Sequence, residues 1–70
     1  MTTQMSNLEL AIEQAKLQDT LQDAANRYGW DSEQVLRLGG FEAFNASIEK
    51  HDSVFRKLSP VERRAYLNAL

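Results

Sequence analysis

The sequence has no cysteine, one histidine, one proline and three glycines among its 70 residues. The lack of cysteine excludes disulfide bonds and thiolate metal sites. A lone histidine, His51, excludes metal sites built from several imidazoles. No apolar run approaches the roughly 18 residues that span a bilayer, and no basic-then-apolar segment opens the chain. The sequence therefore predicts a cytoplasmic protein with no metal, no cofactor and no membrane contact.

Length and charge narrow the functional classes further. A domain of 70 residues buries only about 60–65% of the surface of its unfolded chain, which disfavours a walled catalytic cleft. The adjacent residues His51 and Asp52 would point about 100° apart on a helix, so they form no proton relay by themselves. The chain also has no nucleophile elbow and no phosphate-binding glycine loop. We expect no catalytic residues, no small-molecule ligand and no enzymatic activity.

Residue usage favours helices throughout the chain. Ala, Leu, Glu, Gln, Lys, Arg and Met, which are strong helix formers, supply 38 of the 70 residues, whereas Val and Ile supply five. No segment shows the alternation of apolar and polar residues that is typical of a half-buried strand. We predict an all-α fold, a compact bundle of four or five short helices. Residues 1–5 are expected to be a disordered N-terminus and residues 6–70 a single helical domain.

Capping signals predict where the first helices begin. Ser6 and Glu9 have the spacing of a capping box, in which each side chain bonds to the backbone N–H of the other residue. A weaker cap signal at residues 20–23 favours a break just before it, which gives two helices. One continuous helix over residues 7–28 is the alternative, since that segment contains no glycine or proline.

The later helices have clearer boundaries. The strongest start signal places Ser59 at the N-cap, Pro60 at the first helical position and Glu62 at the third. Trp30 and Phe41 are interpreted as core residues. The remaining elements are expected as a helix capped by Asp31 and ended by Gly39 and Gly40, a helix from Phe41 to about Lys50, a short turn holding Val54, Phe55 and Leu58, and a helix from Pro60 to near Leu70 with Val61, Ala65, Tyr66 and Ala69 facing inward.

Residues 21–41 have the spacing of two helices that cross at a tight turn. Ala25 is a small residue for the crossing, Gly29 tolerates a positive φ in the turn, and Val35 and Leu38 face inward. This segment resembles the helix-turn-helix unit of DNA-binding proteins, which implies that the second helix would face DNA bases. Under that interpretation the nucleic-acid contacts are Arg27, Ser32, Gln34, Arg37, Arg56, Lys57, Arg63 and Arg64.

The charge pattern opposes that interpretation. The second helix begins with Asp31 and Glu33, whereas DNA-binding modules use lysine and arginine to neutralise phosphates. The net charge of −2 divides into −4 over residues 1–35 and +2 over residues 36–70. A basic cluster in the C-terminal half is either a solvated face or a contact for phosphates or an acidic protein surface; it consists of Arg56, Lys57, Arg63 and Arg64.

The first helix carries more apolar surface than a single packing contact needs. If it is continuous, one stripe follows a heptad spacing with Gln14 as a polar residue that sets register, and a second stripe holds Leu8, Ala11, Ile12 and Ala15. Either the C-terminal helices cover both stripes, or one stripe meets another chain. The predicted partner-binding residues lie on the first stripe: Leu10, Gln14, Leu17, Leu21 and Tyr28.

These features predict a small non-enzymatic regulatory protein that acts by binding another protein. Its size and charge are typical of the inhibitors or adaptors that phages and plasmids encode. The partner is either a different protein or a second copy of the chain, as a homodimer. The alternative is a helix-turn-helix transcription regulator whose dimer supplies the missing positive charge. Nucleic acid is therefore the second, disfavoured candidate for the partner.

Overall fold

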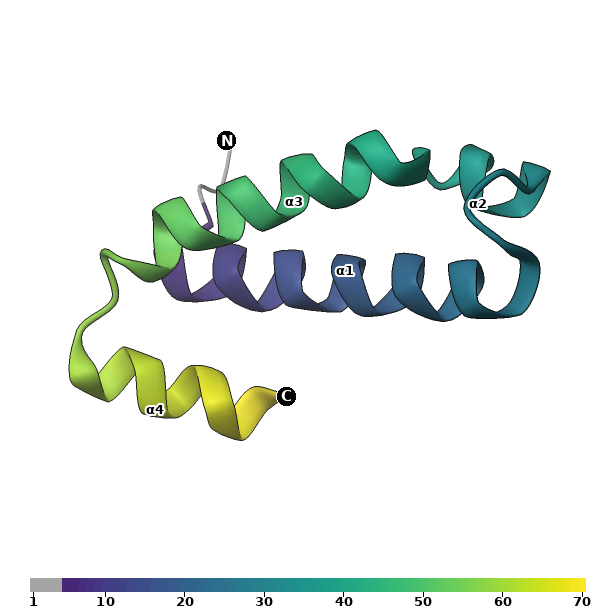
Figure 1. The fold of residues 1–70 in the computed structure, drawn as a ribbon. Helices are drawn as coiled ribbons and strands as arrows, with labels where there is room; N and C mark the ends of the chain where they lie inside the picture. The colour runs from purple at the N-terminus through teal and green to yellow at the C-terminus, as the bar shows by residue number, and fades with distance from the viewer. Residues whose placement is uncertain (1–4) are drawn as a thin grey trace.

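The computed structural model describes residues 5–70, which form four helices and no strand. The helices are α1 (Asn7–Tyr28), α2 (Glu33–Arg37), α3 (Gly40–Phe55) and α4 (Pro60–Ala69), shown in Figure 1. The predicted all-α class is confirmed. The predicted disorder of residues 1–5 falls mostly outside the described residues, which begin at Met5.

The first helix is continuous over 22 residues, so the break that the sequence favoured is wrong. The hydroxyl of Thr20, in the predicted second cap, instead donates to the carbonyl of Lys16 at 3.0 Å, as hydroxyl side chains inside helices often do. The helix ends at Tyr28. Gly29 follows as its C-cap, with a φ of +90° and an N–H that donates to the carbonyl of Ala25 at 2.8 Å. Without a glycine or proline near residue 20, nothing interrupts the backbone ladder.

The caps that begin α1 and α4 lie where the sequence predicts them. Ser6 accepts from the N–H of Glu9 at 3.1 Å, although the Glu9 carboxylate contacts the Ser6 hydroxyl instead of closing the box through the backbone. Ser59 and Glu62 form a complete capping box, with Pro60 at the first helical position. Both caps depend on residues three positions apart, which is why local sequence is enough to predict them.

Two boundaries in the middle of the chain differ from the prediction. Ser32 caps α2 by accepting from the N–H of Val35 at 3.3 Å, one residue later than the predicted cap Asp31. The third helix runs through to Phe55 without the predicted separate turn. The carbonyl of Asp52 accepts from the N–H of Arg56 at 3.2 Å, so helical hydrogen bonding continues past the predicted stop.

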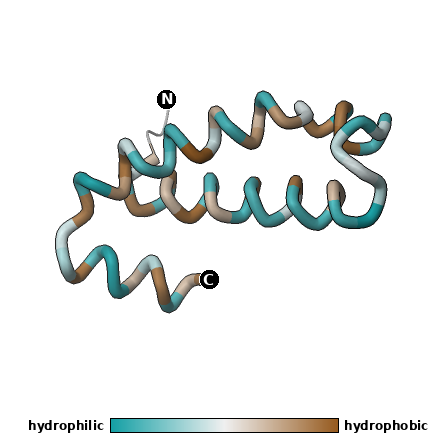
Figure 2. Tube along the Cα trace, viewed as in Figure 1, coloured by the Kyte–Doolittle hydropathy of each residue, from teal (hydrophilic) through white to brown (hydrophobic). Residues whose placement is uncertain are grey.

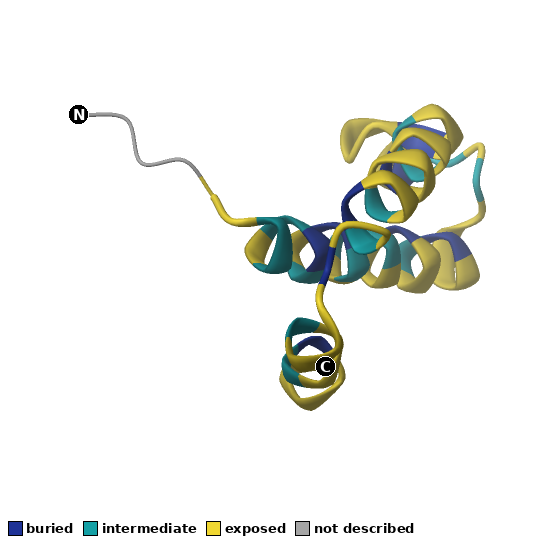
Figure 3. Cartoon of the chain, turned by 90° about the vertical axis from the view of Figure 1, so that its left-hand side faces the viewer, coloured by how far each residue is buried: buried dark blue, intermediate teal, exposed yellow. Residues whose placement is uncertain are grey.

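The helices α1 and α3 lie antiparallel and make the main contact of the fold (Figure 1). The short helix α2 joins them at one end, where Ala25 and Val35 are buried. At the other end α4 packs against α1, and Figure 3 shows α4 standing apart from the α1–α3 pair and exposed over most of its surface. The core at the α4 end consists of Ala11, Val54, Leu58 and Tyr66.

Every helix mixes hydrophilic and hydrophobic residues, as Figure 2 shows along the chain. Within residues 5–70, no helix is both long enough and apolar enough to cross a bilayer. The two apolar stripes of α1 make contacts within the chain, since side chains of α1 pack against both α3 and α4. This arrangement matches the alternative in which the C-terminal helices cover both stripes.

Candidate functional site

The predicted partner-binding residues of α1 do not form one exposed surface. Leu21 is fully buried and Gln14 is 8% exposed, while Leu10 and Leu17 are half-buried. Only Tyr28, at the end of the helix, is exposed. In the folded chain the centre of this set therefore belongs to the intramolecular core and is closed to a partner.

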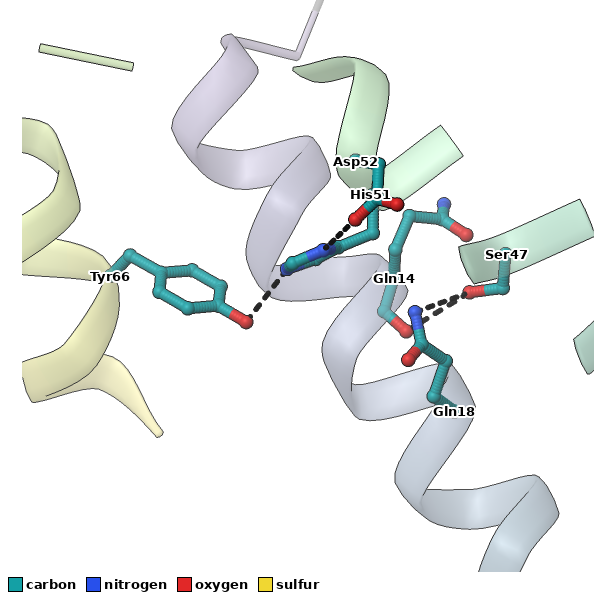
Figure 4. A network of polar contacts seen from close by, with 6 residues as sticks. All are labelled: Gln14, Gln18, Ser47, His51, Asp52 and Tyr66. Atoms are coloured by element: carbon teal, nitrogen blue, oxygen red, sulfur yellow. Dashed lines mark hydrogen bonds and ion pairs between the residues drawn. The ribbon is translucent and has the colours of Figure 1, made fainter. Parts of the chain in front are cut away.

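A buried serine explains how a polar residue fits into the α1–α3 contact. Ser47 of α3 donates to the backbone carbonyl of Gln14 at 3.1 Å, and the amide of Gln18 donates to the Ser47 hydroxyl at 3.4 Å (Figure 4). No buried side-chain nitrogen or oxygen lacks a partner in the part of the chain that is described. These hydrogen bonds help to set the register of α1 against α3.

A second polar array holds α4 to the rest of the fold. The Nε2 atom of His51 lies 2.8 Å from the hydroxyl of Tyr66, and Figure 4 shows the two rings meeting between α3 and α4. The ring of Phe55 stacks on His51 at 5.4 Å and meets Tyr66 edge-on at 5.2 Å. The guanidinium of Arg63 lies 5.2 Å from the centre of the Phe55 ring. Sequence reasoning missed this array because it joins residues that are distant along the chain.

The array consists of packed rings and one side-chain hydrogen bond. Asp52 Oδ1 is 3.8 Å from His51 Nδ1, which is beyond hydrogen-bond distance, so no carboxylate orients the imidazole. Over residues 5–70 no group of three or more His, Asp or Glu side chains is placed to hold a metal ion. The contacts of His51 with Tyr66 join α3 to α4.

Burial raises the pKa of the Tyr66 phenol above its ordinary value of 10.0. A raised pKa means that the folded state holds this proton more tightly, so stability is lost as pH rises above about 10. We expect Tyr66→Phe to be about 1 kcal/mol less stable than wild type at pH 7, because the bond to His51 is gone. The difference should shrink at pH 10.5, because only the wild type has the Tyr66 proton to lose.

Urea unfolding at the two pH values, followed by circular dichroism, measures this effect. Tyr28→Phe is the matched control, because Tyr28 is exposed and makes none of the contacts of Tyr66. A stability difference between Tyr66→Phe and wild type that stays the same at both pH values would contradict the assignment.

The predicted nucleic-acid residues are divided between opposite ends of the fold. Arg27 pairs with Asp23 at 3.3 Å and Arg37 with Glu33 at 2.6 Å, both near α2. The basic cluster of Arg56, Lys57, Arg63 and Arg64 lies at the far end, where α3 leads into α4 (Figure 1). The hydroxyl of Ser32 is engaged in capping α2. These residues form no continuous basic surface.

The third helix carries a regular apolar stripe on the flank of its contact with α1. We call it the α3 stripe, and it consists of Phe41, Phe44, Ile48, His51 and Phe55. These residues follow one another at intervals of three and four, which places them on one side of a helix. Tyr66 and Arg63 of α4 contact the end of the stripe that holds His51 and Phe55. The half nearer α2 has no such cover.

Trp30 partly covers the half of the α3 stripe nearer α2. Its ring meets Phe41 at 5.1 Å and Phe44 at 5.2 Å, both in edge-on geometry. Phe41 is nevertheless 55% exposed and Ile48 38% exposed, so the expectation that Phe41 belongs to the core is wrong. Trp30 itself is half-buried.

Small residues, rather than large ones, face α1 from the third helix. Gly40, Ser47 and Val54, seven residues apart, are the buried positions of α3. Ser47 bonds to Gln14 of α1 and Val54 packs in one cluster with Ala11 of α1, whereas Gly40 lies beside Leu36 of α2. Leu38, Val61 and Ala69, which were also expected to face inward, are exposed, because other residues of their segments are the buried ones.

Comparisons with protein-family models, with curated proteins and with solved structures find no match for this chain. Its function is therefore inferred from the burial, charge and contacts of its own residues.

Proposed function

We propose that this chain is a small non-enzymatic protein that acts by binding another protein through an apolar helix face. The observation that supports the proposal is the exposure of Phe41 and Ile48 on the half of the α3 stripe nearer α2, where Trp30 packs on Phe41. Exposed apolar side chains that lie together are typical of interaction sites in small proteins, whereas scattered ones are ordinary. Aromatic residues are also enriched at protein interfaces.

Neighbouring residues extend the apolar character of this end of the molecule. Tyr28, Leu36 and Leu38, from the end of α1 and from α2, are large and exposed. We therefore assign the partner-binding surface to the region where α1, α2 and α3 meet, instead of to the middle of α1. The chain would act by binding to a surface of its partner, as an inhibitor or an adaptor does. The lack of cysteine fits a reducing, cytoplasmic setting.

Affinity capture from the native cell, with mass spectrometry of the captured proteins, tests the proposal. We expect the wild type to retain a protein that Phe41→Glu loses, because a carboxylate cannot be buried at an apolar interface without a partner. Leu67→Glu on α4 is the matched control, since Leu67 is 68% exposed and lies outside the α3 stripe. Circular dichroism checks that both variants are folded.

Two results would count against a protein partner at this face. One is capture of the same proteins by wild type and by Phe41→Glu. The other is a gel shift of genomic DNA fragments at about 50 mM salt, where phosphate contacts are strongest, without any captured protein that depends on Phe41. That second outcome would favour the transcription regulator.

A further inference from the structure

We propose that α4 is a strap, a segment that opens as a unit while α1, α2 and α3 stay packed. Its opening uncovers a second, largely apolar surface, made of Ala11 and Ala15 of α1 with His51 and Phe55 of α3. This conformational device is a property of the chain itself, and it does not depend on which molecule the chain binds.

The helix α4 buries little of itself against the rest of the fold. Tyr66 is the one buried residue among its ten, and Val61 and Leu67 are 79% and 68% exposed. Along residues 5–70, the one hydrogen bond that joins α4 to another helix lies between the hydroxyl of Tyr66 and Nε2 of His51, at 2.8 Å. The attachment of α4 therefore rests on this bond and on the packing around Tyr66.

The corner between α3 and α4 allows the strap to move separately. Ser59 precedes a proline and has an extended backbone with a ψ of 164°, so α3 cannot continue as a helix into α4. The N-terminus of α4 is capped from within, because Ser59 and Glu62 form a complete capping box. Leu58, just before the corner, is buried, and its N–H donates to the carbonyl of Phe55 at 3.1 Å. The hinge is therefore at Ser59, and α4 leaves without breaking a backbone hydrogen bond of α3.

The contacts that join α1, α2 and α3 lie away from α4. Leu21 and Val35 are the largest fully buried side chains of the described residues, and neither belongs to the cluster that holds Tyr66. Ser47 of α3 also donates to the backbone carbonyl of Gln14 in α1, at 3.1 Å. Release of α4 leaves these contacts in place, which is the condition for opening of one part of a fold without the rest.

The open state gains conformational entropy as it loses the contacts of α4. A helix of about ten residues is marginal in water by itself, so the released α4 unwinds. Its freed backbone and side chains recover the entropy that ordering them had removed, which offsets part of the lost packing. Opening of α4 therefore requires less free energy than unfolding of the whole chain.

Opening changes the surface that the chain presents. In the closed state Tyr66 and Arg63 cover the end of the α3 stripe that holds His51 and Phe55. In the open state that end is uncovered, together with Ala11, which has no exposed surface while α4 is closed. The strap thus regulates how much apolar surface the chain exposes.

Thiol labelling tests the opening, because the chain has no cysteine of its own. Ala11→Cys places a thiol in the cluster that holds Tyr66, and Ser47→Cys places one in the contact of α3 with α1. We expect iodoacetamide to label the thiol at residue 11 at least about tenfold faster than the global unfolding equilibrium of the same variant allows. The thiol at residue 47 should be labelled only as fast as global unfolding allows. Urea unfolding of each variant measures that equilibrium.

A second substitution distinguishes local opening from global unfolding. Val35→Ala removes buried apolar atoms at the α2 end, in a region that stays packed when α4 opens. It should speed labelling in the Ser47→Cys variant roughly tenfold, and change labelling in the Ala11→Cys variant by no more than about twofold. Tyr66→Phe removes the bond to His51, which is lost in both events, and should speed labelling in both variants about fivefold.

Hydrogen exchange of the unaltered chain makes the same measurement without a substitution. The amides of Ala65 and Tyr66 in α4 should exchange at least about tenfold faster than the amide of Leu21 in α1, and their exchange should depend less on urea. Equal protection and equal urea dependence in α4 and α1 would overturn the proposed opening. So would labelling of Ala11→Cys that matches global unfolding and that Val35→Ala speeds as much as it speeds labelling of Ser47→Cys.

Discussion

Leu21→Ala is expected to lower the free energy of unfolding by about 3 kcal/mol, because truncation of a fully buried leucine removes apolar burial and leaves a cavity. Leu21 has no exposed surface and lies on the face of α1 that meets α3. A domain of 70 residues has a total stability of roughly 4–10 kcal/mol, so the loss is a large share of it. The midpoint of thermal unfolding should fall by about 10–20 °C.

Urea unfolding followed by circular dichroism measures this loss against a matched control. Leu67→Ala makes the same chemical change at a residue of α4 that is 68% exposed, and should alter stability by less than about 0.5 kcal/mol. Similar losses in the two variants would mean that the α1–α3 contact is not the main core of the fold.

Gly39→Ala is expected to cost roughly 2–4 kcal/mol, because it combines an unfavourable backbone conformation with a steric clash. Gly39 has a φ of +112°, a region that residues with a side chain rarely adopt. A Cβ at this position would lie 2.5 Å from the Cβ of Ala43, and neither methyl group has a rotamer that avoids the contact. The turn from α2 into α3 would have to shift.

Gly29→Ala separates the two contributions to that cost. Gly29 has a φ of +90°, but a Cβ there meets nothing within 4 Å, so only the conformational cost of about 1–2 kcal/mol applies. Replacing Ala43 by glycine in the Gly39→Ala background should recover part of the lost stability by removing the clash. Equal losses of unfolding free energy at the two glycines, measured by urea unfolding, would show that the clash with Ala43 does not contribute.

The helix ends illustrate what local sequence can predict. Two caps were predicted, Ser6 with Glu9 and Ser59 with Glu62. The partners in each cap lie within one helical turn, so their hydrogen bonds do not depend on how the helix packs. The prediction failed at Thr20, where a hydroxyl can either cap a new helix or bond to a carbonyl of the same helix. Local sequence does not choose between these two bonds.

The candidate site was harder to predict than the helices. The heptad spacing on α1 was real, but Gln14 and Leu21 are buried inside the folded chain. Phe41 was interpreted from the sequence as a core residue, yet it is 55% exposed. A period of three and four residues shows that side chains share a face, and does not show whether that face is covered.

The sequence by itself determined the helical class and most helix boundaries, because these depend on propensities and on bonds between residues a few positions apart. Only the tertiary structure decided which faces are covered. Ser47 and Val54 face α1, while Phe41 and Ile48 stay exposed, and α4 covers one end of the stripe and not the other. Burial depends on what another helix can reach, and that is a property of the packed chain.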